Sequence, residues 1–363
     1  MADETFDGLA LAVGTQTAAG GFGFINATVR DLSGTIDETD GCVLGDKASG
    51  DAESGISSPT LEAIFREVAA VAASFTESAD SFQRLSVSGF SITFPVQGNG
   101  ATATTPAAGE ADLATLFPGY EALYEMMGLI GANGAAPVVE YTPRHSGSSD
   151  GSTIYGTIKV WHGDLSMVFE DCLIESAEFV STPGGNVLCT ANILVGKTDT
   201  ANIADGVTFP TITYGAMSSL AAPVVEGVAF ATFGQTRPFE NLTVKVQNTI
   251  EEFGDSNVAT TGKRQAQTRR QILVSGTIYV ATADSDAAVQ NLINSSAPTA
   301  DLSFQVGTAA GASDVVNAFK VEVNNLQSKS IKYNRIGQAL VAELTDAKAT
   351  ATSAGAEFKL TMN

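Results

Sequence analysis

The sequence predicts a mainly β protein built from two tandem copies of one β-rich domain, and three observations lead to this prediction. Residues 24–38, FINATVRDLSGTIDE, resemble residues 239–252, FENLTVKVQNTIEE. Val-Ser-Gly at 87–89 and again at 274–276 leads into alternating apolar residues. The 36 glycines among 363 residues, together with frequent Thr, Ser and Ala, are typical of short strands joined by turns. Similar segments this far apart in one chain indicate an internal repeat.

The first copy is expected over residues 22–196, after an N-terminal arm of small and polar residues at 1–21. Ser58 and Pro59 favour the start of a helix, and apolar residues follow at helical spacing from Leu61 to Val71. This inserted helix has no counterpart in the second copy. A flanking helix is expected near 116–127. Strands are expected at 85–96, 154–161, 165–169, 172–180 and 187–195.

The second copy is expected over residues 239–363, after a linker at 197–238 that contains several prolines. A long loop from about 253 to 270 separates its first two matched strands. Its flanking helix is expected at 287–293. Its closing strands are expected at 302–306, 319–323, 330–333, 339–344 and 357–362.

The charge of the chain limits the kinds of partner that it can bind. The formal net charge is −21 and the isoelectric point is near 4.3. Nucleic-acid binding depends on Lys and Arg that displace counterions from phosphate, so this balance argues against tight binding. An acidic surface is compatible with DNA that moves past without binding, or with a role in solubility alone.

Cysteine usage and the N-terminal sequence indicate a protein made in a reducing compartment. Cys42, Cys172 and Cys189 are odd in number and lack CxxC spacing, which predicts free and mostly buried thiols. The acidic start MADETFDG has no apolar core of the kind found in a secretory signal. The most apolar stretch, 220–233, is too short to span a bilayer.

The patterns that could carry catalysis each have a simpler interpretation. His145 and His162 lack the spacing of a metal pair. Residues 147–151 fit G-x-S-x-G, but a flexible loop leads into a strand there, whereas a nucleophile elbow lies between a strand and a helix. The sequence therefore predicts a protein that is not an enzyme, with no catalytic, cofactor-binding or metal residues.

Four basic residues gather within eight positions of the second copy: Lys263, Arg264, Arg269 and Arg270. An ordinary solvated loop is one interpretation. The rest of the chain is strongly acidic, however, so another copy of the same chain offers a complementary surface. These residues are therefore predicted to contact a neighbouring subunit head to tail, in the manner that builds rings or filaments.

The chain resembles the major tail tube proteins of long-tailed bacteriophages. The resemblance lies in the order of strand, long loop, Val-Ser-Gly strand, helix and closing strands, and above all in RRQILVSGTIYV at 269–280, with EEFGDSN before it. It implies a β-sandwich or small barrel with one flanking helix in each copy. In that family such domains close into rings of six that stack into a hollow tube.

The resemblance implies a structural role in the virion tail, after assembly in the host cytoplasm. Two domains in one chain imply homotrimeric rings with pseudo-sixfold symmetry. The implied partners are further copies of the chain, a tape-measure protein, a tail terminator, distal tail proteins, and genomic DNA that passes through during ejection without tight binding. No cofactor and no membrane contact are implied.

A channel for DNA is expected to be lined by carboxylates on strands, since exposed cations would hold the DNA. The candidate residues are Asp31, Asp37, Glu170, Glu175, Glu178 and Glu251. Two alternatives remain open: a distal tail or baseplate ring protein of the same fold, and a repeat-containing carbohydrate-binding adhesin.

Overall fold

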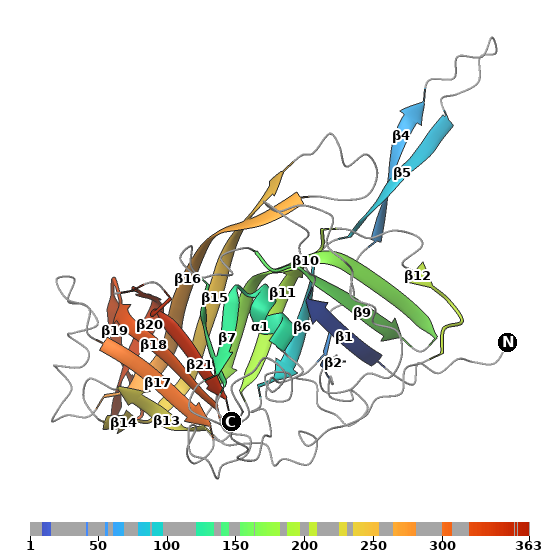
Figure 1. The fold of residues 1–363 in the computed structure, drawn as a ribbon. Helices are drawn as coiled ribbons and strands as arrows, with labels where there is room; N and C mark the ends of the chain where they lie inside the picture. The colour runs from blue at the N-terminus through green and yellow to red at the C-terminus, as the bar shows by residue number, and fades with distance from the viewer. Residues whose placement is uncertain are drawn as a thin grey trace.

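The chain folds mainly into antiparallel β-strands, as a computed structural model shows (Figure 1). This confirms the mainly β prediction. The structure describes residues 9–15, 41–42, 55–56, 61–68, 79–87, 89–96, 121–133, 139–144, 153–162, 164–181, 187–196, 203–208, 225–230, 235–253, 264–280, 300–306, 319–351, 353 and 355–362.

A central sheet runs through both halves of the chain. Its strands pair in the order β6-β11-β10-β15-β16-β20. Their bounds are β6 Phe90–Pro95, β11 Leu188–Leu194, β10 Leu165–Ser181, β15 Phe239–Phe253, β16 Arg264–Tyr279 and β20 Ala339–Ala349. The short β3 (Gly55–Ile56) adds to β6, and β19 (Ile331–Ile336) adds to β20. The halves meet where β10 pairs with β15, from Ser176↔Gln247 to Ser181↔Leu242.

Strand β10 belongs to two sheets. Its first part pairs with β9 (Gly156–His162) and β12 (Ile203–Ala204); β9 continues to β1 (Leu9–Thr15), and β1 to β2 (Gly41–Cys42). The partners change at a bulge, where Asp171 has a φ of 53°. Asp tolerates this left-handed conformation better than most residues, and a bulge bends its strand. The two strands predicted at 165–169 and 172–180 are therefore one bent strand.

Strand β18 (Phe319–Gln327) connects the remaining strands. On one side it pairs with β17 (Ala300–Val306), which continues to β13 (Val225–Phe230) and β14 (Gln235–Arg237). On the other side it pairs with the end of β20 and with β21 (Phe358–Met362). β21 in turn pairs with β8 (Val139–Pro143) of the first half, and β8 with β7 (Leu129–Asn133). The closing strands predicted for the second copy are thus confirmed as strands.

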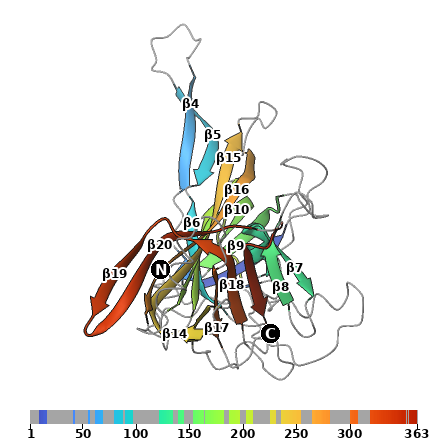
Figure 2. The same ribbon diagram turned by 90° about the vertical axis from the view of Figure 1, so that its left-hand side faces the viewer.

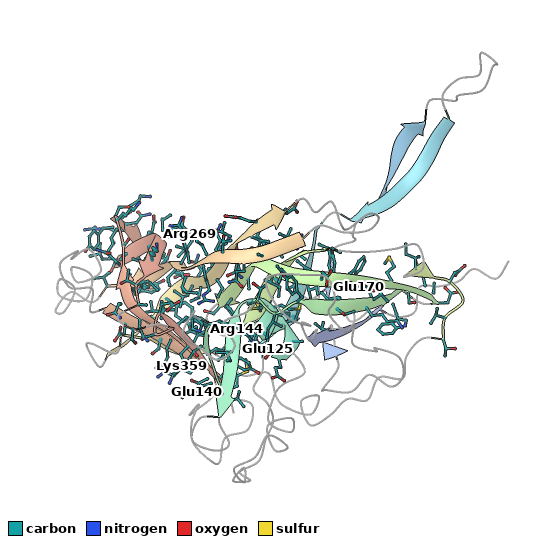
Figure 3. The ribbon with its side chains drawn as sticks, turned by 45° about the horizontal axis from the view of Figure 1, so that its top comes forward. Glu125, Glu140, Arg144, Glu170, Arg269 and Lys359 are labelled. Carbon is teal, nitrogen blue, oxygen red and sulfur yellow. The ribbon has the colours of Figure 1, made fainter. Side chains whose placement is uncertain are left out.

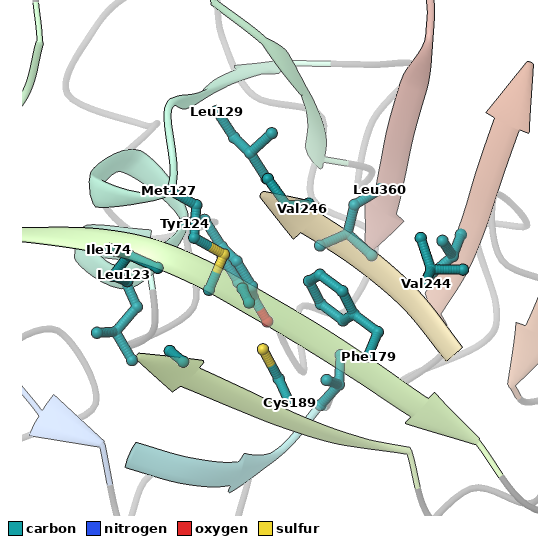
Figure 4. Packing of buried hydrophobic residues seen from close by; sticks show 14 of the residues in the cluster. Leu123, Tyr124, Met127, Leu129, Ile174, Phe179, Cys189, Val244, Val246 and Leu360 are labelled. Carbon is teal, nitrogen blue, oxygen red and sulfur yellow. The ribbon is translucent and has the colours of Figure 1, made fainter. Parts of the chain in front are cut away.

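One hydrophobic core extends through both halves. The helix α1 (Glu121–Met126) contributes the buried Leu123 and Tyr124, and the Tyr124 ring lies 5.0 Å from that of Tyr141. Phe179 of the first half lies 6.1 Å, centroid to centroid, from Phe358 of the second, and both are fully buried. Phe179 and Leu360, one from each half, are labelled among the core residues in Figure 4. The halves are therefore joined by packing as well as by strand pairing.

The inserted helix predicted from Leu61 to Val71 is wrong for residues 61–68. These form β4 (Leu61–Val68), which pairs with β5 (Ala79–Val87) in a separate two-stranded sheet. Figures 1 and 2 show this hairpin projecting away from the rest of the strands. Short apolar runs fit both helix and strand patterns, and here a pairing partner further along the chain decides for the strand.

Several predicted features are covered only in part. The predicted helix near 116–127 is a helix over Glu121–Met126, and the residues just before it lie outside the described ones. The repeat segment 24–38 and the helix at 287–293 also lie outside the described residues. The superposition of the two copies therefore stays a prediction. The predicted linker contains the short strands β12, β13 and β14.

Candidate functional site

One face of the central sheet, called the polar face here, carries polar side chains in rows that cross the strands. Alternate residues of a strand point to opposite faces, so the other face packs into the core with Phe179, Val244 and Val246. One row of successive register partners is Thr93, Thr190, Glu178, Lys245, Leu273 and Lys348. A second row is Ser91, Asn192, Ser176, Gln247 and Gln271.

Neighbours within these rows contact one another across the strands. The hydroxyls of Thr93 and Thr190 lie 3.0 Å apart. The Asn192 amide donates to Ser176 Oγ over 2.8 Å. Lys245 Nζ lies 2.7 Å from Glu178 Oε1, and both side chains are about one third exposed. The polar face is therefore ordered by its own contacts, and the charge of Glu178 is balanced where it stands.

The carboxylates predicted to line a channel do not fall into one row. Glu178 lies on the polar face; Glu175 is exposed where the register shifts between Ile174 and Ser176. Glu251 is exposed near the end of β15, and Glu170 is half-buried in the part of β10 that pairs with β9 (Figure 3). Asp31 and Asp37 lie outside the described residues. Whether these residues face a channel stays a prediction.

The loop predicted up to Arg270 is wrong over residues 264–270, because β16 begins at Arg264. Its pairing with β15 continues from Phe253↔Arg264 inward, so the two strands form one long hairpin. Lys263 lies outside the described residues. Alternation along β16 then separates the two neighbouring arginines: Arg269 is exposed, whereas Arg270 turns inward.

Arg270 binds groups from both halves of the chain. Its Nη1 donates to the carbonyl of Gly128 over 2.7 Å, and its Nη2 donates to the carbonyl of Arg144 over 2.6 Å. Nη2 also lies 3.5 Å from Glu357 Oε1. Burial lowers the pKa of Arg270, and the nearby carboxylate of Glu357 opposes this shift only in part. A guanidinium nevertheless stays charged throughout the physiological range. The guanidinium of Arg270 binds groups of its own chain, so the predicted contact with a neighbouring subunit now rests on Lys263, Arg264 and Arg269.

Further polar groups surround Arg270 and connect the same segments. Arg144 Nε donates to the carbonyl of Leu129 over 3.0 Å, and its Nη2 lies 3.6 Å from Glu125 (Figure 3). Asn248 donates to the carbonyls of Met127 and Ile174, and Gln267 donates to Asn248 Oδ1 over 2.6 Å. We call this set the polar junction; its members are Glu125, Gly128, Arg144, Asn248, Gln267, Arg270 and Glu357. It fixes the turn after α1 against the β15–β16 hairpin.

The hairpin of β19 and β20 is a surface whose importance the sequence analysis missed. Tyr333 and Ile336 on β19 are 48% and 42% exposed, and they are the exposed large hydrophobic residues of the described part of the chain. Lys329, Lys332 and Arg335 lie within seven positions of one another. The basic cluster at 263–270 gave the same signal and was recognised, so this second cluster could have been found in the same way.

Two cysteines and two tyrosines of the described residues are buried with a raised pKa, and Tyr141 and Tyr155 are the tyrosines. Cys172 and Cys189 are free and buried, as predicted for them, and burial raises the pKa of both thiols. The Tyr155 hydroxyl donates to the carbonyl of Gln265 in β16. Burial, and to a smaller extent Asp171, raises the pKa of Tyr155 from 10.0 to about 12. Both kinds of group are held in the neutral form by the fold.

The raised pKa of Tyr155 predicts a dependence of stability on alkaline pH. The unfolded tyrosine loses its proton near pH 10 and the folded one near pH 12, so the folded state binds more protons between these values. The stability that Tyr155 contributes is therefore complete below about pH 10 and is lost as the pH rises toward 12. We expect Tyr155→Phe to flatten the fall in urea midpoint over this range. Parallel curves for the parent and the variant would contradict this assignment.

Within the described ranges, no group of three or more His, Cys, Asp and Glu residues could hold a metal ion. In the same part of the chain, no helix is long and apolar enough to cross a membrane. No protein-family model and no curated protein matches the sequence.

Proposed function

We propose that this chain is a structural protein that polymerises into stacked rings and forms the hollow tail tube of a long-tailed bacteriophage. The observation that carries the proposal is the central sheet, which continues from β6 to β20 through both halves of the chain. One face of this sheet packs into the core and the other carries the polar rows. A wall built from such sheets has one anchored side and one side that can face a water-filled channel.

The two Val-Ser-Gly motifs support a duplicated domain. A Cβ on Gly89 would lie 2.6 Å from the carbonyl oxygen of Ile193, and a Cβ on Gly276 would lie 2.5 Å from that of Asn241. Both glycines thus allow a close approach to the backbone of a neighbouring strand. Their settings differ, since Gly89 lies between β5 and β6 and Gly276 lies within β16. Two copies of a tube domain in each chain favour homotrimeric, pseudo-hexameric rings.

The charge of the chain supports a channel through which DNA slides. At a net charge of −21 the protein repels phosphate in general. Most side chains of these rows are hydroxyls and amides; of the two lysines in the rows, Lys245 is neutralised by Glu178, and Lys348 is exposed. Glu170, Glu175 and Glu251, with Asp31 and Asp37, remain the candidate acidic lining. Glu178 contributes less than its position suggests because of its ion pair.

Electron microscopy of the purified protein in negative stain tests the proposal. We expect long tubes of uniform width with a stain-filled centre, together with single rings whose mass is that of three chains. Isolated rings that never stack would favour the alternative of a distal tail or baseplate ring protein. A protein that stays monomeric at high concentration and in crowding salts would overturn both.

A further inference from the structure

The hairpin at residues 329–344, called the basic arm here, is a ribbon with exposed surfaces on both sides. Among the strands that the structure describes, β19 pairs with β20 alone, so the outer edge of β19 lacks a strand partner. Lys332 to Ile336 are all exposed. Gly337, with a φ of 62°, begins the two-residue turn. Tight hairpin turns favour glycine at positions with a positive φ. Figure 2 shows the ribbon standing at the side of the molecule.

The basic arm has the opposite charge to the chain that carries it. Lys329, Lys332, Arg335 and Glu343 give residues 329–344 a net charge of +2, whereas the whole chain carries −21. Glu343 is occupied within the arm, since Lys332 Nζ lies 3.2 Å away and the Asn334 amide donates to it over 2.9 Å. These contacts hold the ribbon in shape and leave Lys329 and Arg335 exposed at its surface.

The exposed apolar and basic groups coincide on the arm. Tyr333 and Arg335 are two positions apart on one strand, so they lie on the same face of the ribbon. Lys332 and Ile336 lie on the opposite face. An aromatic ring beside an arginine is the composition that protein interfaces favour, and a bare strand edge can pair with another chain. The exposed side chains and the free edge of β19 are therefore suited to contact with another protein surface.

We propose that the basic arm docks on the acidic surface of a second copy of this chain. The charge of each partner selects this arrangement: two arms would repel one another, and the rest of the chain would repel a nucleic acid. The contact is heterologous, because arm and acidic surface are different parts of the molecule, and such contacts propagate into rings or filaments. The inference deepens the proposed function, because it names a contact between copies, but it requires only self-association and not a tube.

A matched pair of charge reversals tests the role of the arm. Arg335→Glu changes the exposed arm, whereas Lys348→Glu makes the same charge change at an exposed position of β20 outside it. Lys348 lies on the polar face, which is proposed to face a channel and not a neighbouring subunit, so the change should leave association as it is. Sedimentation velocity at low salt measures the self-association constant of the parent and of each variant. We expect Arg335→Glu to lower it about tenfold or more, because like charges oppose each other at the contact. Lys348→Glu is expected to stay close to the parent.

An apolar change and a cross-linking experiment complete the test. Tyr333→Ser is expected to weaken association at both low and high salt, whereas the effect of Arg335→Glu is expected to shrink as salt screens the charges. In an equal mixture of isotopically light and heavy chains, a zero-length carbodiimide cross-link is expected to join Lys329 or Lys332 of one chain to a carboxylate of the other. Both variants should keep the far-ultraviolet spectrum of the parent, since they alter exposed side chains.

The outcomes separate this inference from the proposed function. Tubes that form equally well from Arg335→Glu, Tyr333→Ser and the parent would overturn the docking of the arm and leave the proposed tube intact. Small oligomers of the parent that never become tubes, but that dissociate in both arm variants, would support the docking of the arm and overturn the proposed tube. A parent that is monomeric at every salt concentration, or cross-links found only within one chain, would overturn the arm.

Discussion

Replacing Phe179 with alanine is expected to lower the free energy of unfolding by about 3–5 kcal/mol, the range for deleting a fully buried aromatic ring. Phe179 is 0% exposed, and its ring lies 6.1 Å from that of Phe358. Alanine would remove apolar surface and leave a cavity where the halves meet, because a packed core relaxes only in part. Equilibrium unfolding in urea measures the change, and Gln247→Ala, at an exposed position of β15, is the control.

The same experiment decides whether the halves unfold as one unit. The single tryptophan, Trp161, is buried in the first half, so its fluorescence reports on that half alone. Phe358→Ala changes the second half. A shared core requires that this variant shift the Trp161 transition as far as it shifts the far-ultraviolet circular dichroism transition. A Trp161 transition left at the parent midpoint would show that the halves are independent.

Replacing Arg270 with methionine is expected to cost about 3–5 kcal/mol, as the loss of one partner from a buried ion pair does. The substitution keeps much of the apolar stem but removes the guanidinium from Glu357 and from the carbonyls of Gly128 and Arg144. The Gly128 carbonyl keeps the backbone N–H of Arg144 as a donor, 2.9 Å away. The neighbouring Arg269→Met is the control. Its side chain is exposed, so we expect a change within about 0.5 kcal/mol. Urea midpoints of the two variants give the comparison.

A double substitution tests whether the charge of Glu357 is the cause. Removing both charges, as Arg270→Met with Glu357→Gln, is expected to recover part of the loss, because no buried charge is then left unpaired. Equal losses for Arg269→Met and Arg270→Met would contradict the inward position of Arg270. A double variant no more stable than Arg270→Met would assign the loss to the two carbonyls instead.

Local patterns in the sequence predicted most of the strands, because alternation and turn residues act over a few positions. β11, β18 and β21 were found in this way. The helix predicted from Leu61 is wrong because the apolar spacing there suits both a helix and a strand. Pairing with β5 makes the segment a strand. The break predicted at 170–171 is a bulge, since the partners that continue β10 come from elsewhere in the chain.

The candidate site was harder to predict than the strands, because charge clusters are visible in a sequence but their directions are not. Arg269 and Arg270 are adjacent, yet one is exposed and the other joins the polar junction. The register of β16 decides this, and it depends on β15. Lys245, which balances Glu178, comes 67 positions later in the chain. No local pattern reveals a partner at that separation.

The pairing of β8 with β21 has a consequence for the timing of folding during synthesis. Lys359 of β21 lies 3.0 Å from Glu140 of β8, and 219 positions separate them in the chain. At about 5–20 residues per second, a ribosome needs roughly 10–45 s to make the intervening chain. Among the strands that the structure describes, β21 alone pairs with this edge of β8, so none of them covers the edge during this interval. The pairing of β8 with β21 therefore forms only after β21 has been made.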